Sequence, residues 1–440
     1  MAVLTGTLSS GWVAVSSVRS SNGPVEEGDS LLVMFWNIEN MFDYRDSGTG
    51  ESDTEFSSFG QRRWTKSRFY AKCNAIAKSV LWIADSKGRL PDVIGFAEVE
   101  NAFAVRSIIG ATALKKCGYS MVHFDSPDSR GIDVALLYRD DVFEKLSARS
   151  CHIYGDYDGQ SDWQDSGPEP VRVQQEQEKS CCDNAECGIR QAELMGTRDI
   201  LLVSLKHRTD GLTYHFLVNH HPSKYGGAKA SEGRRRIAMR TLRNLCDSLS
   251  ASGESKSAAV VAGVDDIAGP AGDGDVRIIA MGDFNDTPSG GPFDILCGGN
   301  GLAERDHNAM ENSGGGQTAP VRPDDDWRIW TDAERSGFGR GRNVMVNLGD
   351  GLEDRGEGTI RYGGKWELID MFIVSRSLAG QSAAADCESG RRCRMEVVRI
   401  PFLITRDNTH VGDRPLRTYS GPRYLGGVSD HCPIVLTVRR

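Results

Sequence analysis

The chain has 440 residues, of which 39% are hydrophobic and 26% are charged, and its formal net charge is −9. These proportions are typical of a soluble globular protein with a large core. The acidic balance argues against a protein whose main role is to coat nucleic acid or an anionic membrane, but it permits a local basic cleft. No run approaches the roughly 18 apolar residues of a membrane span.

The N-terminal stretch 1–30 lacks the basic start of a signal peptide, and Gly, Ser and Thr interrupt its apolar residues. We expect this segment to be poorly ordered and residues 31–440 to form one domain. The location stays open between the cytoplasm and export with a leader that precedes this numbering. Eleven cysteines leave at least one unpaired. Two polar clusters are compatible with local disulfides or with exposed thiols: Cys181, Cys182 and Cys187 in one, Cys387 and Cys393 in the other.

Short apolar segments rich in β-branched and aromatic residues predict strands along the whole chain. In chain order they are 31–39, 92–99, 133–138, 200–206, 214–221, 277–284, 367–375, 395–400 and 432–438. Helical patterns alternate with them at 62–85, 105–118 and 232–251. This mixture predicts an α/β domain in which sheets pack on each other beneath helices.

Three polar stretches interrupt this pattern. Residues 151–198, 252–275 and 303–358 are rich in glycine, charged or small polar residues, so we expect long loops inserted in the domain.

The helical segment at 232–251 carries five arginines, and the pattern predicts a solvated, exposed face rather than a surface that binds a polyanion. These arginines are Arg234, Arg235, Arg236, Arg240 and Arg243.

Polar residues gather at the ends of the predicted strands, where they break apolar runs. The set is Asn37, Glu39, Glu98, His220, His221, Asp283, Asn285, Asp370, Asp430 and His431. Each residue taken alone is more simply a turn residue, a cap or a structural histidine. Six strands that share this feature indicate a site, because buried carboxylates need a cation or a charged partner. An oxygen-rich set without thiolates suits Mg²⁺ or Mn²⁺.

The motifs FWNIEN, FAEVEN, VNHHPS, GDFND, LIDMF and SDHCPI, in this order, resemble those of the endonuclease/exonuclease/phosphatase superfamily. The match runs from about residue 31 to the C-terminus, and the surrounding sequence is similar to a bacterial, largely uncharacterised branch. The resemblance implies a deoxyribonuclease I-like fold. This fold is a four-layer α/β sandwich, with two mixed β-sheets packed face to face and flanked by helices, and with the site at one end.

The resemblance also implies a metal site and substrate contacts. Glu98 would be the principal metal carboxylate, with Asn37, Glu39 and Asp430 beside it. Arg130, just before a predicted strand, would contact the substrate phosphate together with Asn37 and Asn285. Weaker candidates for the rim of the site are Lys224, Tyr362, Trp366, Arg423 and Tyr424.

The catalytic roles follow from the same motifs. Asp283 and Asn285 would orient the attacking water and hold the phosphate, and His431 would stabilise the phosphate as it is attacked. Asp370 would fix the tautomer of His431. His220 corresponds to the other histidine of the family, with His221 as the weaker alternative.

These residues predict a divalent-metal-dependent hydrolase of phosphoester bonds. The favoured reaction is that of a phosphodiesterase or nuclease in which water attacks in line. Two alternatives stay open: a phosphomonoesterase acting on a small polyol or lipid phosphate, and a non-catalytic binding protein of the same fold. The substrate stays open among an oligonucleotide, a lipid head group and a small phosphate ester, and no obligate protein partner is evident.

Overall fold

The structure is a computed structural model that describes residues 30–46, 51–156, 192–224, 227–254, 276–297, 345–379 and 393–439. The N-terminal segment and most of the three expected insertions lie outside these ranges, as do Cys181, Cys182, Cys187 and Cys387. Among the described cysteines, Cys73, Cys117, Cys151, Cys246, Cys297 and Cys432 are free thiols. No helix within the described ranges is long and apolar enough to cross a membrane.

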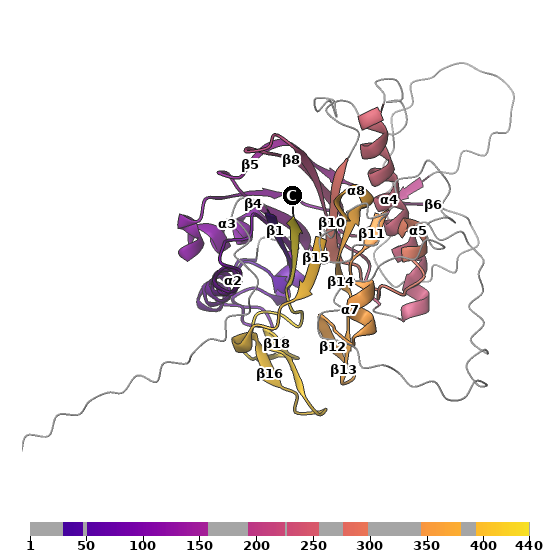
Figure 1. The fold of residues 1–440 in the computed structure, drawn as a ribbon. Helices are drawn as coiled ribbons and strands as arrows, with labels where there is room; N and C mark the ends of the chain where they lie inside the picture. The colour runs from indigo at the N-terminus through magenta and orange to yellow at the C-terminus, as the bar shows by residue number, and fades with distance from the viewer. Residues whose placement is uncertain are drawn as a thin grey trace, which may run out of the picture.

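Two six-stranded mixed sheets form the centre of the molecule (Figure 1). The first contains, in spatial order, β15 (Cys393–Val397), β20 (Ile434–Arg439), β1 (Ser30–Met41), β2 (Val93–Val99), β4 (Asp133–Arg139) and β3 (Tyr119–His123). The second contains β11 (Met345–Asn347), β14 (Asp370–Ser375), β10 (Arg277–Asp283), β9 (Thr213–His220), β8 (Ile200–His207) and β5 (Phe143–Cys151). Each sheet has one parallel pair, β1 with β2 and β9 with β10, and its other neighbours run antiparallel.

Helices cover the outer face of each sheet (Figure 1). Helices α2 (Lys66–Lys87) and α3 (Ala102–Gly110) share a buried apolar cluster with the first sheet. Helices α4 (Ala228–Glu254) and α5 (Phe293–Cys297) share one with the second sheet. The predicted four-layer α/β sandwich is therefore confirmed. The remaining short helices are α1 (Glu51–Glu55), η1 (Ala113–Lys116), α7 (Asp350–Asp354), α8 (Arg376–Ala379) and η2 (Pro401–Leu403).

The alternation of side chains along β1 divides the core into two layers. Val33 and Phe35 belong to the cluster between the sheets, whereas Met34 and Trp36 belong to the cluster beneath α2 and α3. Successive side chains of a strand point to opposite faces. Asn37 is the next residue on the face of Val33 and Phe35, so the strand directs its amide into the space between the sheets.

Four two-stranded hairpins extend from the sandwich. They are β6 (Tyr154–Asp156) with β7 (Ala192–Leu194), β12 (Ile360–Tyr362) with β13 (Lys365–Glu367), β16 (Ile404–Arg406) with β17 (Asp413–Pro415), and β18 (Tyr419–Ser420) with β19 (Arg423–Tyr424). In Figure 1 the last three project together from one end of the molecule. The β12–β13 hairpin directly precedes β14, and the other two directly precede Asp430, so all three lie beside predicted site residues.

The predicted elements agree with the structure in type and differ at some boundaries. The segment 367–375 forms a strand only from Asp370, because residues 365–367 pair with β12 instead. The helical pattern at 105–118 divides into α3 and the separate turn η1. Strands β3, β5 and β11 were not predicted, and β11 and α7 lie in the described part of the expected insertion at 303–358.

The expectation of an exposed arginine face on α4 is wrong for two of its five members. Arg235 and Arg243 are buried. The Nε of Arg235 donates to Asp286 Oδ2 at 2.9 Å, and the Nη1 of Arg243 donates to the carbonyl of Leu296 at 2.8 Å. Both side chains therefore attach α4 to the segment that follows β10.

Candidate active site

Three neighbouring strands of the second sheet place three of the predicted site residues side by side. Asp283 at the end of β10 is paired with His220 of β9 on one side and with Asp370 of β14 on the other. Paired residues on adjacent strands point to the same face of a sheet. The Nε2 of His220 accordingly lies 3.7 Å from Asp283 Oδ2.

Gly282 makes this close pairing of strands possible. A Cβ atom at position 282 would lie 2.4 Å from the carbonyl oxygen of Asn219 on β9. Any larger residue would therefore push apart the two strands that carry Asp283 and His220. The glycine of the GDFND motif is required by packing, and not by chemistry.

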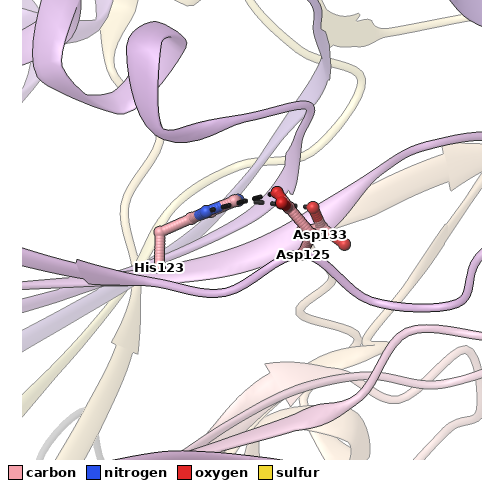
Figure 2. A group of neighbouring side chains, drawn as sticks. All are labelled: His123, Asp125 and Asp133. Atoms are coloured by element: carbon pink, nitrogen blue, oxygen red, sulfur yellow. Dashed lines mark ion pairs between the residues drawn. The ribbon is translucent and has the colours of Figure 1, made fainter. Parts of the chain in front are cut away.

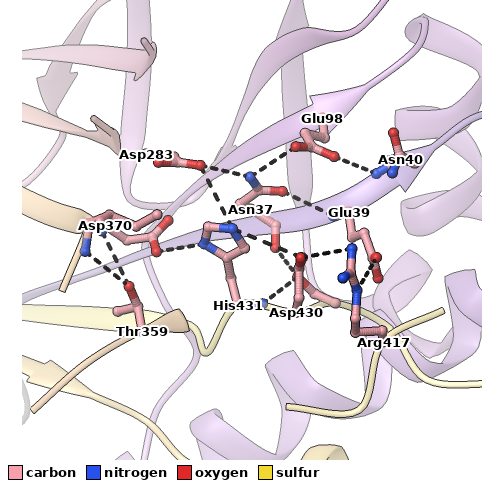
Figure 3. A network of polar contacts seen from close by, with 12 residues as sticks. Asn37, Glu39, Asn40, Glu98, Asp283, Thr359, Asp370, Arg417, Asp430 and His431 are labelled. Carbon is pink, nitrogen blue, oxygen red and sulfur yellow. Dashed lines mark hydrogen bonds and ion pairs between the residues drawn. The ribbon is translucent and has the colours of Figure 1, made fainter. Parts of the chain in front are cut away.

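Asn37 joins the two sheets across the site (Figure 3). Its Nδ2 donates to Asp283 Oδ2 at 3.0 Å and to Glu98 Oε1 at 3.2 Å. Glu98 Oε1 is also 3.9 Å from the Nε2 of His220. One buried amide thus holds a carboxylate from each sheet, and it fixes the distance between them.

Strained backbone surrounds these carboxylates. Of the five non-glycine residues with positive φ in the described ranges, four belong to the site: Glu39, Asn40, Glu98 and Asn285. The pairing of β1 with β2 is irregular between Asn37 and Met41, as expected for a bulge. In β2, alternation alone would turn Glu98 toward the helices with Phe96, whereas at φ 62° its carboxylate reaches Asn37 between the sheets. Such strain is typical of functional sites and costs about 1–3 kcal/mol per residue.

His431 and Asp370 form a buried pair (Figure 3). The Nδ1 of His431 lies 2.7 Å from Asp370 Oδ2, and its Nε2 faces Asp283 Oδ2 at 3.8 Å. Burial alone would lower the pKa of His431, but the carboxylates of Asp370, Asp283 and Asp430 hold it well above its usual value. The backbone N–H of Asp370 also donates to Thr359 Oγ1 at 3.3 Å, which fixes the aspartate in turn.

The pKa values of Asp283 and His220 are shifted as well. Burial, and then the neighbouring Asp370, raises the pKa of Asp283 to about 7. Burial, with Arg198 and Arg130 as further causes, lowers the pKa of His220 well below its usual value. At neutral pH the site therefore holds a charged His431, a neutral His220 and an aspartate that can gain or lose a proton.

Asn285 and His221 support the site through the backbone. The backbone N–H of Asn285 donates to Asp283 Oδ1 at 2.9 Å, and its Nδ2 donates to the carbonyl of His221 at 3.0 Å. Arg198 donates to the same carbonyl at 2.6 Å. The buried ring of His221 packs against Phe284, with 5.0 Å between ring centroids. Of the two adjacent histidines, His220 is the one that faces the carboxylates.

Arg417 closes the opposite side of the site (Figure 3). Its Nε donates to Glu39 Oε1 at 2.9 Å, and its Nη2 lies 3.0 Å from Asp430 Oδ2. The other oxygen of Glu39 accepts from the backbone N–H of Thr418 at 2.9 Å. Both oxygens of Glu39 are thus bound to protein donors. Burial, and then Asp430, raises the pKa of Glu39 to about 7.

The arrangement fits a divalent cation. Five carboxylates gather here, whereas the cationic side chains beside them in the described part of the chain are Arg417, His431 and the buried Lys72, which donates to the backbone carbonyl of Glu39. Asp370 Oδ1 has no hydrogen-bond partner among the described atoms. The excess negative charge and the all-oxygen donors match the preference of Mg²⁺ and Mn²⁺. The five carboxylates belong to Glu39, Glu98, Asp283, Asp370 and Asp430.

Two arginines flank Asp128 in the loop that follows β3. Arg130 of this loop is half-exposed, with its Nε 3.8 Å from Asp128 Oδ2, and the buried Arg198, just before β8, lies 3.2 Å from the other oxygen of Asp128. Their charges contribute to the lowered pKa of His220. The substrate contact expected of Arg130 stays a prediction. Lys224 is 3.9 Å from Asp286 and 3.8 Å from Glu367, so carboxylates partly neutralise its charge.

A second His–Asp cluster ties down this same loop (Figure 2). The Nε2 of His123 is 3.3 Å from Asp133 Oδ2, and its Nδ1 is 3.9 Å from Asp125 Oδ1. Asp133 also accepts from the backbone N–H of Ser126 at 3.0 Å, while the side chain of Asp125 is 89% exposed. These contacts explain the cluster as an anchor for the base of the loop that carries Arg130.

Sequence reasoning missed several residues that shape the site. Arg417, Arg198 and Thr359 contact site residues, although the sequence did not single them out. Arg417 lies only a few positions before Arg423 and Tyr424, the two weaker candidates for the rim. In the structure Tyr424 lies beneath Arg68, whose guanidinium is 4.3 Å from its ring centroid.

The sequence matches the model of the Endonuclease/Exonuclease/phosphatase family over residues 32–165, 175–294 and 335–440. The chain belongs to this family of phosphoesterases. No curated protein matches the chain. Among solved structures, an Endonuclease/Exonuclease/phosphatase family protein from Bacteroides thetaiotaomicron is 13% identical with a TM-score of 0.44, and the match covers 93% of this chain and 97% of that one.

Two further solved structures resemble this member of the family at a similar level. The human Nocturnin catalytic domain is 11% identical with a TM-score of 0.43, covering 93% of this chain and 95% of that one. A mannosyl-6-phosphatase from Bacteroides thetaiotaomicron is 14% identical with a TM-score of 0.43, covering 92% and 98%. At these identities the similarity concerns the fold alone.

Proposed function

We propose that this family member is a divalent-metal-dependent phosphodiesterase. The observation that carries the proposal is the convergence of Asp283, His220, His431 and Glu98, whose facing atoms lie 3.7–3.9 Å apart. These separations exceed hydrogen-bond length, so the facing ring nitrogens keep their hydrogen bonds for a group that enters the site. A titratable aspartate opposite a charged histidine is the pair needed to attack a phosphoester with water.

The roles of the chain's own residues follow from their protonation. Deprotonated Asp283 accepts a proton from water, and the N–H of Asn285 on its Oδ1 orients that carboxylate. Charged His431 donates from Nε2 toward a phosphate oxygen, and Asp370 on its Nδ1 holds the ring in place. Neutral His220 offers a further hydrogen bond at the same position. General acid–base catalysis of this kind raises the reaction rate by about 10²–10⁴-fold.

Glu98 and Asp430 are proposed to hold the cation, with Asn37 organising Glu98. Glu39, bound on both oxygens by Arg417 and Thr418, supports Asp430 through the shared arginine. When bound, a divalent ion polarises the phosphoryl group and offsets charge on the leaving oxygen.

The test compares hydrolysis of bis-p-nitrophenyl phosphate and p-nitrophenyl phosphate, with Mg²⁺ or Mn²⁺ and with EDTA. We expect turnover of the diester that EDTA abolishes and that Asp283→Ala lowers at least about a hundredfold. Asp141→Ala serves as the matched control, because this exposed aspartate follows β4 and pairs with Arg139 rather than with a site residue. Turnover of the monoester alone would replace the proposal with a phosphomonoesterase. A folded protein that binds Mn²⁺ and hydrolyses neither would contradict it.

A further inference from the structure

A pocket of about 570 Å³ lies between two of the projecting hairpins. The β12–β13 hairpin contributes Arg361 and Trp366, the β16–β17 hairpin contributes Arg406 and Asp413, and Arg399 lies between β15 and β16. The lining thus carries three guanidinium groups and one carboxylate. Arg361 also faces the buried Asp407, so the charge that is free to attract an anionic ligand comes from the exposed Arg399 and Arg406.

The pocket is built around Trp366. The guanidinium carbon of Arg399 is 4.5 Å from the centroid of its ring, and that of Arg361 is 5.9 Å away. Stacking on an aromatic ring holds an arginine in place and leaves its edge free to bind an anion. Arg399 also pairs with Glu357 at 2.9 Å, but both side chains are about two-fifths exposed, so this pair is weak.

The tips of the β12–β13 and β16–β17 hairpins pack closely against each other. Gly412 has φ 107°, and a Cβ atom there would lie 2.7 Å from Arg361 Nη1. Arg361 uses its two Nη atoms to donate to the carbonyls of Asp413 and Val411, and its side chain is only 6% exposed. Its Nε lies 3.8 Å from Oδ2 of the buried Asp407. Arg361 is therefore a fixed, paired wall of the pocket, and the exposed Arg399 and Arg406 are the donors that a ligand can reach.

Hydrogen bonds connect the pocket directly to the proposed catalytic histidine. Ile360, the neighbour of Arg361, forms a β-bridge with His431, and the N–H of Cys432 donates to the carbonyl of Thr359 at 2.7 Å. On the other wall, the N–H of Val398 donates to the carbonyl of Pro433 at 2.8 Å, one residue before Arg399. Both walls are therefore fixed to the segment that carries His431.

We infer that this pocket, here called the arginine subsite (Arg361, Trp366, Arg399 and Arg406), binds a second phosphate of the same substrate molecule. The inference rests on the proposed function, because it assigns the reacting phosphate to the site at Asp283 and His431. The subsite then selects phosphodiesters that carry a further phosphate, such as a nucleotide with a phosphate on its other hydroxyl. Arg399 and Arg406 are the exposed contacts, whereas Arg361 is a fixed wall.

The test compares thymidine 5′-(4-nitrophenyl phosphate) with and without a 3′-phosphate. We expect the 3′-phosphate to raise kcat/KM of the wild type about tenfold, as charge-assisted hydrogen bonds do. The double variant Arg399→Ala, Arg406→Ala should lose this preference and hydrolyse the unphosphorylated substrate as the wild type does. Arg394→Ala is the matched control, since Arg394 is similarly exposed and paired with a glutamate at 3.1 Å, but lies outside the pocket.

A binding measurement separates the two proposals. Thymidine 3′,5′-bisphosphate is titrated calorimetrically into the full chain in EDTA, beside inorganic phosphate alone. About tenfold weaker binding of the bisphosphate to the double variant supports the subsite, even if no substrate is hydrolysed and the proposed function fails. Equal kcat/KM for the two substrates in an active wild type overturns the subsite and leaves the proposed function standing. If inorganic phosphate binds as tightly as the bisphosphate and depends equally on the two arginines, the subsite binds free phosphate. That result would overturn the inference that it binds a second phosphate of the substrate.

Discussion

Replacing Asp283 with asparagine should make the metal-free protein more stable at pH 8, although the same change removes the proposed general base. Burial, and then the charge of Asp370, raises the pKa of Asp283 from 3.8 to about 7. A raised carboxyl pKa means that the fold favours the protonated form. The stabilisation that this group provides is complete below pH 4 and is lost as the pH rises through 7.

The size of the effect follows from the same values. A difference of about 3 pH units between the folded and the ordinary pKa corresponds to about 4 kcal/mol. Asparagine avoids this cost, but both oxygens of Asp283 accept hydrogen bonds, from the Nδ2 of Asn37 and the backbone N–H of Asn285. An amide has only one acceptor oxygen for these two donors, and the lost hydrogen bond costs about 1–2 kcal/mol. We therefore expect Asp283→Asn to gain about 2 kcal/mol at pH 8 and to lose about 1 kcal/mol near pH 4.

Urea unfolding of the EDTA-treated wild type and variant, at pH 8 and pH 4.5, measures this difference. Asp92→Asn is the control, because buried Asp92 accepts from the N–H of Leu32 at 2.8 Å and pairs with Arg89. Loss of a well-partnered carboxylate should lower stability at both pH values. An Asp283→Asn variant that is less stable than the wild type at pH 8, or one whose advantage does not change with pH, would refute the reasoning.

Three further predictions concern the site. The kcat/KM for a diester should fall about tenfold per pH unit below about pH 7, because only deprotonated Asp283 accepts the proton of water; a pH–rate profile measures this limb. Asp370→Asn should lower kcat about a hundredfold or more and leave KM within a few-fold, since Asp370 positions His431 and does not meet the substrate; steady-state kinetics test it. Arg417→Met should lower the free energy of unfolding by about 1–2 kcal/mol in urea titrations, because it leaves the carboxylates of Glu39 and Asp430 without their shared partner. The effect is modest because the arginine is 45% exposed and water screens the pair.

The sequence predicts best the parts of the site that follow from regular strands. Alternation in β1 is enough to direct Asn37 between the sheets. Asp283 and Asp370 each mark an apolar run, and the register of their strands places them opposite each other. The fold class followed from the mixture of strands and helices together with the order of the motifs. These features are local, so they are visible along the chain.

The parts that could not be predicted depend on irregular backbone or on distant segments. Glu98 reaches the site because of positive φ at a bulge, where simple alternation would turn it to the other face. Arg417 meets Glu39 across 378 positions of sequence, and no spacing pattern announces that contact. Arg235 is buried against Asp286, although its neighbours on α4 made an exposed face the simpler expectation.

The distribution of charge explains how an acidic protein can act on an acidic substrate. Arg417 and the buried Lys72 offset the charge of Glu39, so the excess negative charge lies toward Glu98, Asp283 and Asp430. A divalent cation bound there would reverse the local potential at the place where the reacting phosphate must enter. The arginine subsite and Arg130 stand further out, where they attract the substrate without neutralising the catalytic carboxylates. Separating the metal-binding carboxylates from the rim arginines in this way lets each group attract its own ligand, whereas an ion pair between them would cancel the field of both.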